Sequence, residues 1–198
     1  MDDRLSRRRE CFIVAAERLF MEHGFDRTAL ADVVKQAGGS LATLYKLFGG
    51  KAGLLEAVVV HRVEQGEARM AEFAAGDCPP REVLMRLADH LRHRFVDPAE
   101  VALSRVVIGY SIENPDFARR FYRTTISKAQ GQLAALFARW RDAGQPLTGD
   151  PHLLAAMFFG MFIYESHFQA ITHSTSFHVD EASLKAEVEF FCHGVGLS

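Results

Sequence analysis

The sequence predicts an all-α protein of about nine helices, because apolar residues recur at helical spacing between clear helix-start signals. Asp97-Pro98, Asn114-Pro115 and Asp150-Pro151 each place a capping residue before a proline that suits a first helical turn. No segment convincingly alternates apolar and polar residues as a half-buried strand does. At 198 residues and 48% hydrophobic, the chain can bury a substantial core. We divide it into residues 1–51 and residues 52–198.

The first segment begins with a helix whose start is basic and which carries an apolar face. Arg4, Arg7, Arg8 and Arg9 form the basic lead-in, which is either a solvated helix start or an arm that reaches DNA phosphates. Gly24 ends this helix and Phe25 closes its apolar end. The apolar face consists of Phe12, Ile13, Ala16, Leu19 and Phe20.

Residues 28–51 predict two short helices joined by a tight turn. Gly38 suits the positive φ of such a turn, and Ser40 can cap the second helix, residues 41–48. About two turns long, that helix is too short to be stable alone. Thr28 is expected to cap the first of the two helices and to offer its hydroxyl to a phosphate. The buried face of the first helix consists of Leu30, Val33, Val34 and Ala37.

The second short helix presents polar and aromatic groups on one side. Leu44 and Phe48 are expected to be buried, which leaves Leu41, Thr43, Tyr45 and Lys46 nearer the outer side. A short capped helix after a glycine-containing turn, with such groups outward, is typical of a helix-turn-helix that enters a DNA major groove.

These residues resemble the DNA-binding domain of TetR-family transcriptional repressors. The resemblance rests on Gly24-Phe25, Thr28, the run AGGSLATLYKLF at 37–48, and Lys51. Four positions depart from the family pattern: Ala29 replaces Ser or Thr, Gly39 replaces Val, Ala42 replaces Gly, and Leu47 replaces His. The missing His would donate a hydrogen bond to a DNA phosphate. The resemblance implies a double-stranded DNA operator as partner. The expected DNA-binding residues are Thr28, Ser40, Leu41, Ala42, Thr43, Tyr45, Lys46, Lys51 and Arg7.

Gly49-Gly50-Lys51 is not a nucleotide-binding loop, because Tyr45 and Ala52 occupy places where a P-loop needs Gly and Ser or Thr. Lys51 at a helix start instead predicts a phosphate contact. In the family such a helix, here 51 to about 75, links the DNA-binding part to the rest of the chain. Further helices are expected over 81–95, 101–110, 116–143 and 152–172, and from Asp180 to about 194.

The C-terminal part lacks an enzymatic motif such as H-E-x-x-H or G-x-S-x-G, so a helical enzyme is disfavoured. Its many aromatic residues either fill a helical core or line an apolar pocket with a few polar groups. Glu165 is a further polar residue that is hard to explain as core. This part also resembles the AefR-like C-terminal domain type of the same repressors. The candidate effector-binding residues are Arg105, Tyr110, Glu113, Phe117, Phe121, Phe158, Phe162 and His167.

Metal binding, cofactors and disulfides are not expected. His90 and His93, with His167, His173 and His178, raise a metal alternative, but no spacing among them is diagnostic. Cys11, Cys78 and Cys192 are odd in number and far apart, which favours reduced thiols. No secretory signal and no membrane-spanning apolar run is present, so we expect a cytoplasmic protein.

The last two helices, about 152–172 and 181–194, carry broad apolar stripes that favour a homodimer, as the family resemblance also implies. The sequence therefore predicts a repressor that a small apolar or aromatic effector releases from a palindromic operator. The alternative is a DNA-binding regulator without such an effector, controlled by protein contact or cysteine redox chemistry. The apolar stripes consist of Leu154, Met157, Phe158, Met161, Phe162, Glu165 and Phe168 on one helix, and Leu184, Val188, Phe191 and Val195 on the other.

Overall fold

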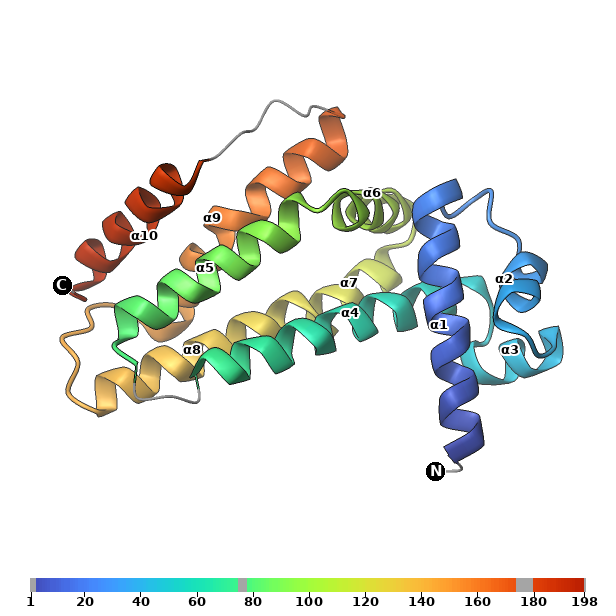
Figure 1. Cartoon of the computed structure of the whole chain (residues 1–198), viewed down its shortest axis with the longest axis horizontal. Coiled ribbons are helices and arrows are strands. Elements are labelled where there is room, and N and C mark those ends of the chain that lie inside the picture. The colour runs from blue at the N-terminus through green and yellow to red at the C-terminus, as the bar shows by residue number, and fades with distance from the viewer. Residues whose placement is uncertain (1–2, 75–77, 174–179, 198) are drawn as a thin grey trace. The chain divides into compact units, whose positions relative to one another are not determined.

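The predicted fold class is confirmed by a computed structural model, which describes residues 3–74, 78–173 and 180–197 (Figure 1). These residues form helices joined by turns and loops, and no strand is found among them. The helices are α1 (Asp3–His23), α2 (Leu30–Ala37), α3 (Leu41–Phe48), α4 (Lys51–Ala74), α5 (Pro80–Val96), α6 (Pro98–Glu113), α7 (Pro115–Thr124), α8 (Ile126–Asp142), α9 (Pro151–Thr172) and α10 (Glu181–Val195).

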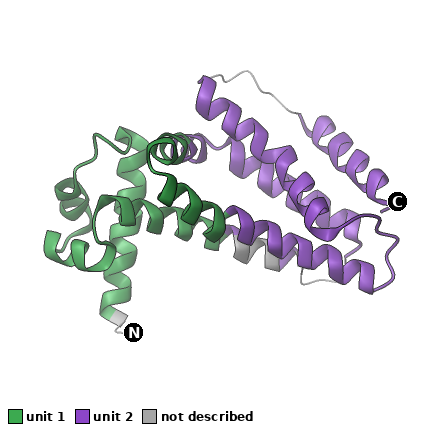
Figure 2. Ribbon diagram, turned by 180° about the vertical axis from the view of Figure 1, so that it is seen from behind, with its two compact units in different colours: residues 1–65, 105–125 green, residues 66–104, 126–198 purple. Residues whose placement is uncertain are grey.

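The chain forms two compact units that do not follow a simple division after residue 51 (Figure 2). Unit 1 comprises residues 1–65 and 105–125, and unit 2 comprises residues 66–104 and 126–198. The first unit therefore includes the end of α6 and all of α7 in addition to the helix-turn-helix segment. Residue 51 thus follows the end of the helix-turn-helix segment. The division into domains 1–51 and 52–198 stays a prediction.

The apolar face predicted for α1 is confirmed and forms the centre of unit 1. Its five residues are all buried, and Phe12, Ile13 and Ala16 have no exposed surface. Phe12 meets the Phe48 ring edge-on, with ring centroids 6.2 Å apart. Val33 of α2 and Leu44 of α3 are also fully buried, so both short helices attach to α1 through their apolar sides.

The single helix expected over residues 116–143 is wrong, because α7 ends at Thr124 and α8 begins at Ile126. Thr125 leaves the helical region with φ −122° and ψ −79°. Its hydroxyl donates to Phe121 O at 2.6 Å, and its N–H bonds to the same carbonyl. Three consecutive β-branched residues, 124–126, lower helix propensity here, and a threonine hydroxyl competes for the backbone groups that would continue the helix.

The core of unit 2 is built from α5, α8, α9 and α10. Phe158 lies at its centre, with ring centroids 5.3 Å from Phe162 and 5.1 Å from Phe191. Asp150 caps α9 by accepting from the N–H groups of His152 and Leu153, and Asp180 caps α10, as predicted. Among the described residues, no helix is long and apolar enough to cross a membrane.

Glu165 of α9 is a half-buried carboxylate near two charged residues of unit 2, Arg92 and Glu187. Its Oε1 is buried and accepts no hydrogen bond from the described residues. Burial raises the pKa of Glu165, and this outweighs the opposing effect of the Arg92 guanidinium. Glu187 adds to the rise because its negative charge disfavours a second carboxylate nearby. Ionised Glu165 therefore destabilises the folded state.

We expect Glu165→Gln to raise the free energy of unfolding at neutral pH by no more than about 0.5 kcal/mol, because the amide removes a charge that is only partly buried and that water still screens. The folded-state pKa is raised, so the folded protein binds the proton more readily than the unfolded chain. Wild-type stability therefore falls as pH rises through the interval between the unfolded and folded pKa. The advantage of the glutamine variant should be present above that interval and vanish below it.

Thermal unfolding of both proteins from about pH 4 to pH 8 measures this difference. Glu64→Gln, at an exposed position of α4, is the matched control. An advantage of the same size at every pH would contradict the assignment of the destabilisation to the charge of Glu165.

Candidate DNA-binding surface

The turn between α2 and α3 has the geometry that its two glycines predict. Gly38 and Gly39 have φ values of +72° and +103°, in the region that disfavours side chains. A Cβ on Gly39 would also lie 3.1 Å from Phe12 Cζ, so the turn runs close against α1. Arg8 secures the turn from α1 by donating from Nη1 to Ala37 O at 3.1 Å. Glycine at 39 thus allows a close approach that the valine of the family pattern would obstruct.

Ser40 caps α3 as predicted. Its side chain accepts from the Thr43 N–H at 3.1 Å, and the two hydroxyl oxygens lie 2.9 Å apart. The helix ends at Phe48, where the Gly49 N–H bonds to Tyr45 O at 2.8 Å. Both ends of this two-turn helix are therefore satisfied locally, which supports a helix too short to persist by itself.

The outer side of α3 is exposed and chemically mixed. Tyr45 and Leu41 have 54% and 43% of their surface exposed, and Ala42 and Lys46 are exposed as well. Thr43 is half-buried. Buried Leu44 holds the opposite side of the helix against the unit, so these outer side chains have a fixed direction. A helix with this exposed face can offer a hydroxyl, a ring and a cation to base edges and phosphates.

Thr28 does not cap α2, and this expectation is wrong. The N-cap of α2 is Ala29, which has no side-chain acceptor. Thr28 is buried, and its hydroxyl lies 2.8 Å from Gly24 O and 3.1 Å from Leu19 O, to which it donates. The threonine closes the loop onto the end of α1, so its hydroxyl is already used inside the protein.

Lys51 is also committed to contacts within unit 1. Its Nζ donates to Asp26 O at 3.1 Å and lies 4.7 Å from the centroid of the Phe25 ring. Partial burial lowers the pKa of Lys51, although the nearby Asp26 carboxylate opposes that change. The ammonium group that was expected to contact a phosphate therefore also holds the α1–α2 loop.

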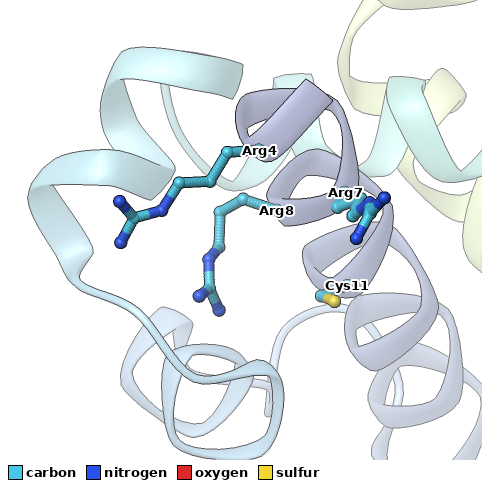
Figure 3. A pocket seen from close by; sticks show the side chains of 4 residues that line it. All are labelled: Arg4, Arg7, Arg8 and Cys11. Carbon is cyan, nitrogen blue, oxygen red and sulfur yellow. The ribbon is translucent and has the colours of Figure 1, made fainter. Parts of the chain in front are cut away.

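The N-terminal half of α1 carries a cluster of positive charge beside a thiol. Arg4, Arg7, Arg8 and Cys11 line a surface cavity of about 270 Å³ (Figure 3). Arg4, Arg7 and Cys11 are exposed. Arg4, Arg8 and Cys11 share one side of α1 because they lie three, four or seven positions apart, and Arg7 adjoins them. Guanidinium groups gathered in this way attract phosphate. Cys192, by contrast, is buried, and burial raises the pKa of its thiol.

The candidate effector-binding residues fall into two sets, one in each unit. Tyr110, Phe117 and Phe121 come together in unit 1, with centroid distances of 4.9 Å and 6.2 Å along that series. Phe158 and Phe162 lie in the core of unit 2. Glu113 in unit 1 and His167 in unit 2 are exposed, and Arg105 belongs to unit 1.

The structure also reveals a contact that the sequence did not indicate. Phe25, in the loop between α1 and α2, lies with its ring centroid 4.7 Å from that of Tyr110 in α6. The bond from Arg8 to Ala37 was likewise not predicted, because the partners are 29 positions apart and no local pattern links them. Among the described residues, no group of three or more potential ligands could hold a metal ion; His178 lies outside them.

The fold and this surface define a helix-turn-helix DNA-binding protein with a helical C-terminal part. Two family descriptions match the chain: "Bacterial regulatory proteins, tetR family" over residues 12–58, and "AefR-like transcriptional repressor, C-terminal domain" over residues 82–192. The chain belongs to the TetR family of bacterial regulatory proteins, as the sequence motifs indicated.

Solved structures and a curated relative agree with this membership. A TetR-family regulator from Mesorhizobium loti MAFF303099, itself described as putative, superposes with a TM-score of 0.85 at 26% identity, covering 98% of this chain and 100% of that one. The "Flavonoid-responsive Regulator FrrA" has a TM-score of 0.71 at 26% identity, covering 96% and 98%. The "HTH-type transcriptional repressor BdcR" of Escherichia coli (strain K12) is 30% identical over 113 residues, which span 56% of this chain and 57% of that protein.

Proposed function

We propose that the protein is a transcriptional repressor that binds a palindromic operator as a homodimer and is released by a small apolar or aromatic effector. The observation that carries the DNA-binding part is the outer side of α3. Its exposed Tyr45 and Lys46 stand on a helix capped by Ser40 and held by buried Leu44. The arginines of α1 add a positive surface for the DNA backbone.

We expect Tyr45→Ala to weaken operator binding by about 1–3 kcal/mol without changing the folded state, because Tyr45 is exposed and its removal leaves the core intact. The operator is first selected from a random duplex library with the wild-type protein. Affinity is then measured by fluorescence anisotropy at several salt concentrations, and it should fall steeply as salt rises.

Tyr122→Ala is the matched control, because Tyr122 of α7 has the same exposed fraction, 54%, and lies outside the helix-turn-helix. Failure of the selection to enrich any duplex would overturn the proposed function. Equal affinities of the Tyr45 variant and the control would remove α3 from the interface.

The homodimer is supported by apolar side chains that remain exposed on the last two helices. Leu153, Met157, Tyr164 and Ile171 are 54–66% exposed and recur at helical spacing along one side of α9, and Phe190 of α10 is 84% exposed. The stripe predicted on α9 is only partly exposed. Met157 is exposed, whereas Leu154, Phe158 and Phe162 are buried in the core of unit 2. Exposed apolar side chains in a row are typical of a protein–protein interface.

We expect Met157→Asp and Tyr164→Asp each to yield monomers that bind a single half-site but not the full operator. A charge placed in the stripe would be desolvated in the dimer. Phe162→Asp or Val188→Asp would not test the interface, since both side chains are buried within unit 2 and a charge there would unfold it.

Light scattering at micromolar concentration measures the mass, and circular dichroism verifies folding. Ile112→Asp, at a 77% exposed position of α6, is the control and should stay dimeric. A wild-type monomer that occupies both half-sites would contradict the proposed assembly.

The effector class is supported by the apolar character of the helical part and by the similarity to FrrA, which is described as flavonoid-responsive. An apolar lining suits flat aromatic or lipophilic molecules, whereas a sugar needs many more polar partners. Binding in the C-terminal part would favour a dimer whose recognition helices no longer match successive major grooves.

We expect an aromatic effector to reduce operator affinity by about 5–150-fold, the usual size of such coupling. A panel of flavonoid aglycones and long-chain fatty acids is first screened by thermal shift, because a bound ligand stabilises the folded protein. Operator titration then follows with each stabilising compound. Ligands that raise the Tm and leave operator affinity unchanged would contradict release by an effector and favour control by protein contact or thiol chemistry.

A further inference from the structure

The loop between α1 and α2 is anchored by one aromatic side chain, Phe25. This ring is half-buried and meets three different helices of unit 1. Its centroid lies 5.4 Å from that of Phe20 in α1 and 4.7 Å from that of Tyr110 in α6. Lys51 Nζ of α4 lies over the ring at 4.7 Å. The loop is therefore held from outside the helix-turn-helix as well as from within.

The other contacts of this loop are mostly local. Thr28 donates to Leu19 and Gly24 carbonyls, and Arg27 Nε donates to His23 O at 2.9 Å. These bonds tie the loop to the end of α1. They do not connect it to α6, which is about eighty positions away in the sequence. Tyr110 supplies that connection.

Tyr110 is itself held in place. Its ring meets buried Phe117 at 4.9 Å with an interplanar angle of 79°, the edge-to-face geometry that aromatic pairs favour. The Asn114 side-chain amide donates to Tyr110 O at 3.0 Å, at the start of α7. An exposed ion pair between Arg120 and Glu56, at 3.2 Å, joins α7 to α4 but contributes less than the packed rings.

The start of α2 depends on the position of this loop. Its N-cap, Ala29, provides no side-chain hydrogen bond to the first turn. The path of the chain from Phe25 to Leu30 therefore sets where α2 begins, and α2 leads through the glycine turn into α3. The position of Phe25 therefore bears on where the first helix of the pair begins, and that helix leads into the second.

We propose that Tyr110 is a positioning residue for operator recognition, acting through Phe25 on the α1–α2 loop. The inference rests on the proposed function and adds a residue of α6 to the structure on which DNA binding depends. Base contacts require a correctly directed α3, whereas backbone contacts by the α1 arginines tolerate a small displacement. Loss of the Tyr110 ring should therefore lower affinity for the operator more than affinity for unrelated DNA.

The test measures binding of the full chain to the selected operator and to a scrambled duplex of the same length. Tyr110→Leu should weaken operator binding by about 3- to 10-fold, as expected from an aromatic contact, and leave scrambled-duplex binding within about twofold. Tyr110→Phe keeps the ring and should restore wild-type affinity. Tyr122→Leu, an exposed tyrosine of α7, is the matched control and should bind as the wild type does.

A double-mutant cycle tests whether Tyr110 acts through its contact with Phe25. Phe25→Leu probes the same contact from the other ring, so it remains informative if Tyr110→Leu fails to fold. The double variant should bind the operator no worse than the weaker single variant, because the two changes break one interaction. Thermal unfolding and amide exchange at residues 24–30 verify that the rest of unit 1 stays folded while the loop loosens.

Unchanged operator affinity in both Tyr110→Leu and Phe25→Leu would overturn the inference alone. Losses that multiply in the double variant, or equal losses for operator and scrambled duplex, would overturn it as well. Absence of any operator for the wild-type protein would instead overturn the proposed function, and this inference with it.

Discussion

The helix-turn-helix of this protein depends on the packing of its two short helices against the buried face of α1. Helices α2 and α3 have eight residues each, too few to be stable in water on their own. Phe12 has no exposed surface, meets the ring of Phe48, and lies where a side chain on Gly39 would collide with it. Together with buried Leu44, this aromatic side chain fixes the direction in which the outer side of α3 points.

The same dependence extends beyond the N-terminal segment. Unit 1 includes residues 105–125, and the contact between Tyr110 and Phe25 joins α6 to the loop that precedes α2. The helix that begins at Lys51 was expected to link the DNA-binding part to the rest of the chain. Helix α6 is a second element in contact with the DNA-binding part. A helix packed directly on the loop that precedes α2 has a physical means of displacing that loop, because closely packed side chains transmit strain.

The structure follows from the sequence where a short-range pattern decides it. The Ser40 cap and the positive φ of Gly38 follow from the needs of the local backbone, so they could be predicted. The structure could not be predicted where a side chain had several possible partners. Thr28 is equally suited to cap a helix or to bond backward, and burial against the end of α1 selected the second. The outer side of α9 also could not be predicted, because a helix with apolar residues on most of its surface has no single inward side.

The sequence alone determined the class of this protein: an all-helical chain whose helix-turn-helix motif and C-terminal pattern identify the family. It did so because helix periodicity, capping residues and turn glycines act over a few neighbouring positions. Tertiary structure decided which functional groups are available. It directed Tyr45 outward, engaged the Lys51 ammonium with the Asp26 carbonyl oxygen, and brought Tyr110 onto Phe25 across about 85 positions of sequence. Contacts at such separations depend on how whole helices pack, which no local pattern of residues encodes.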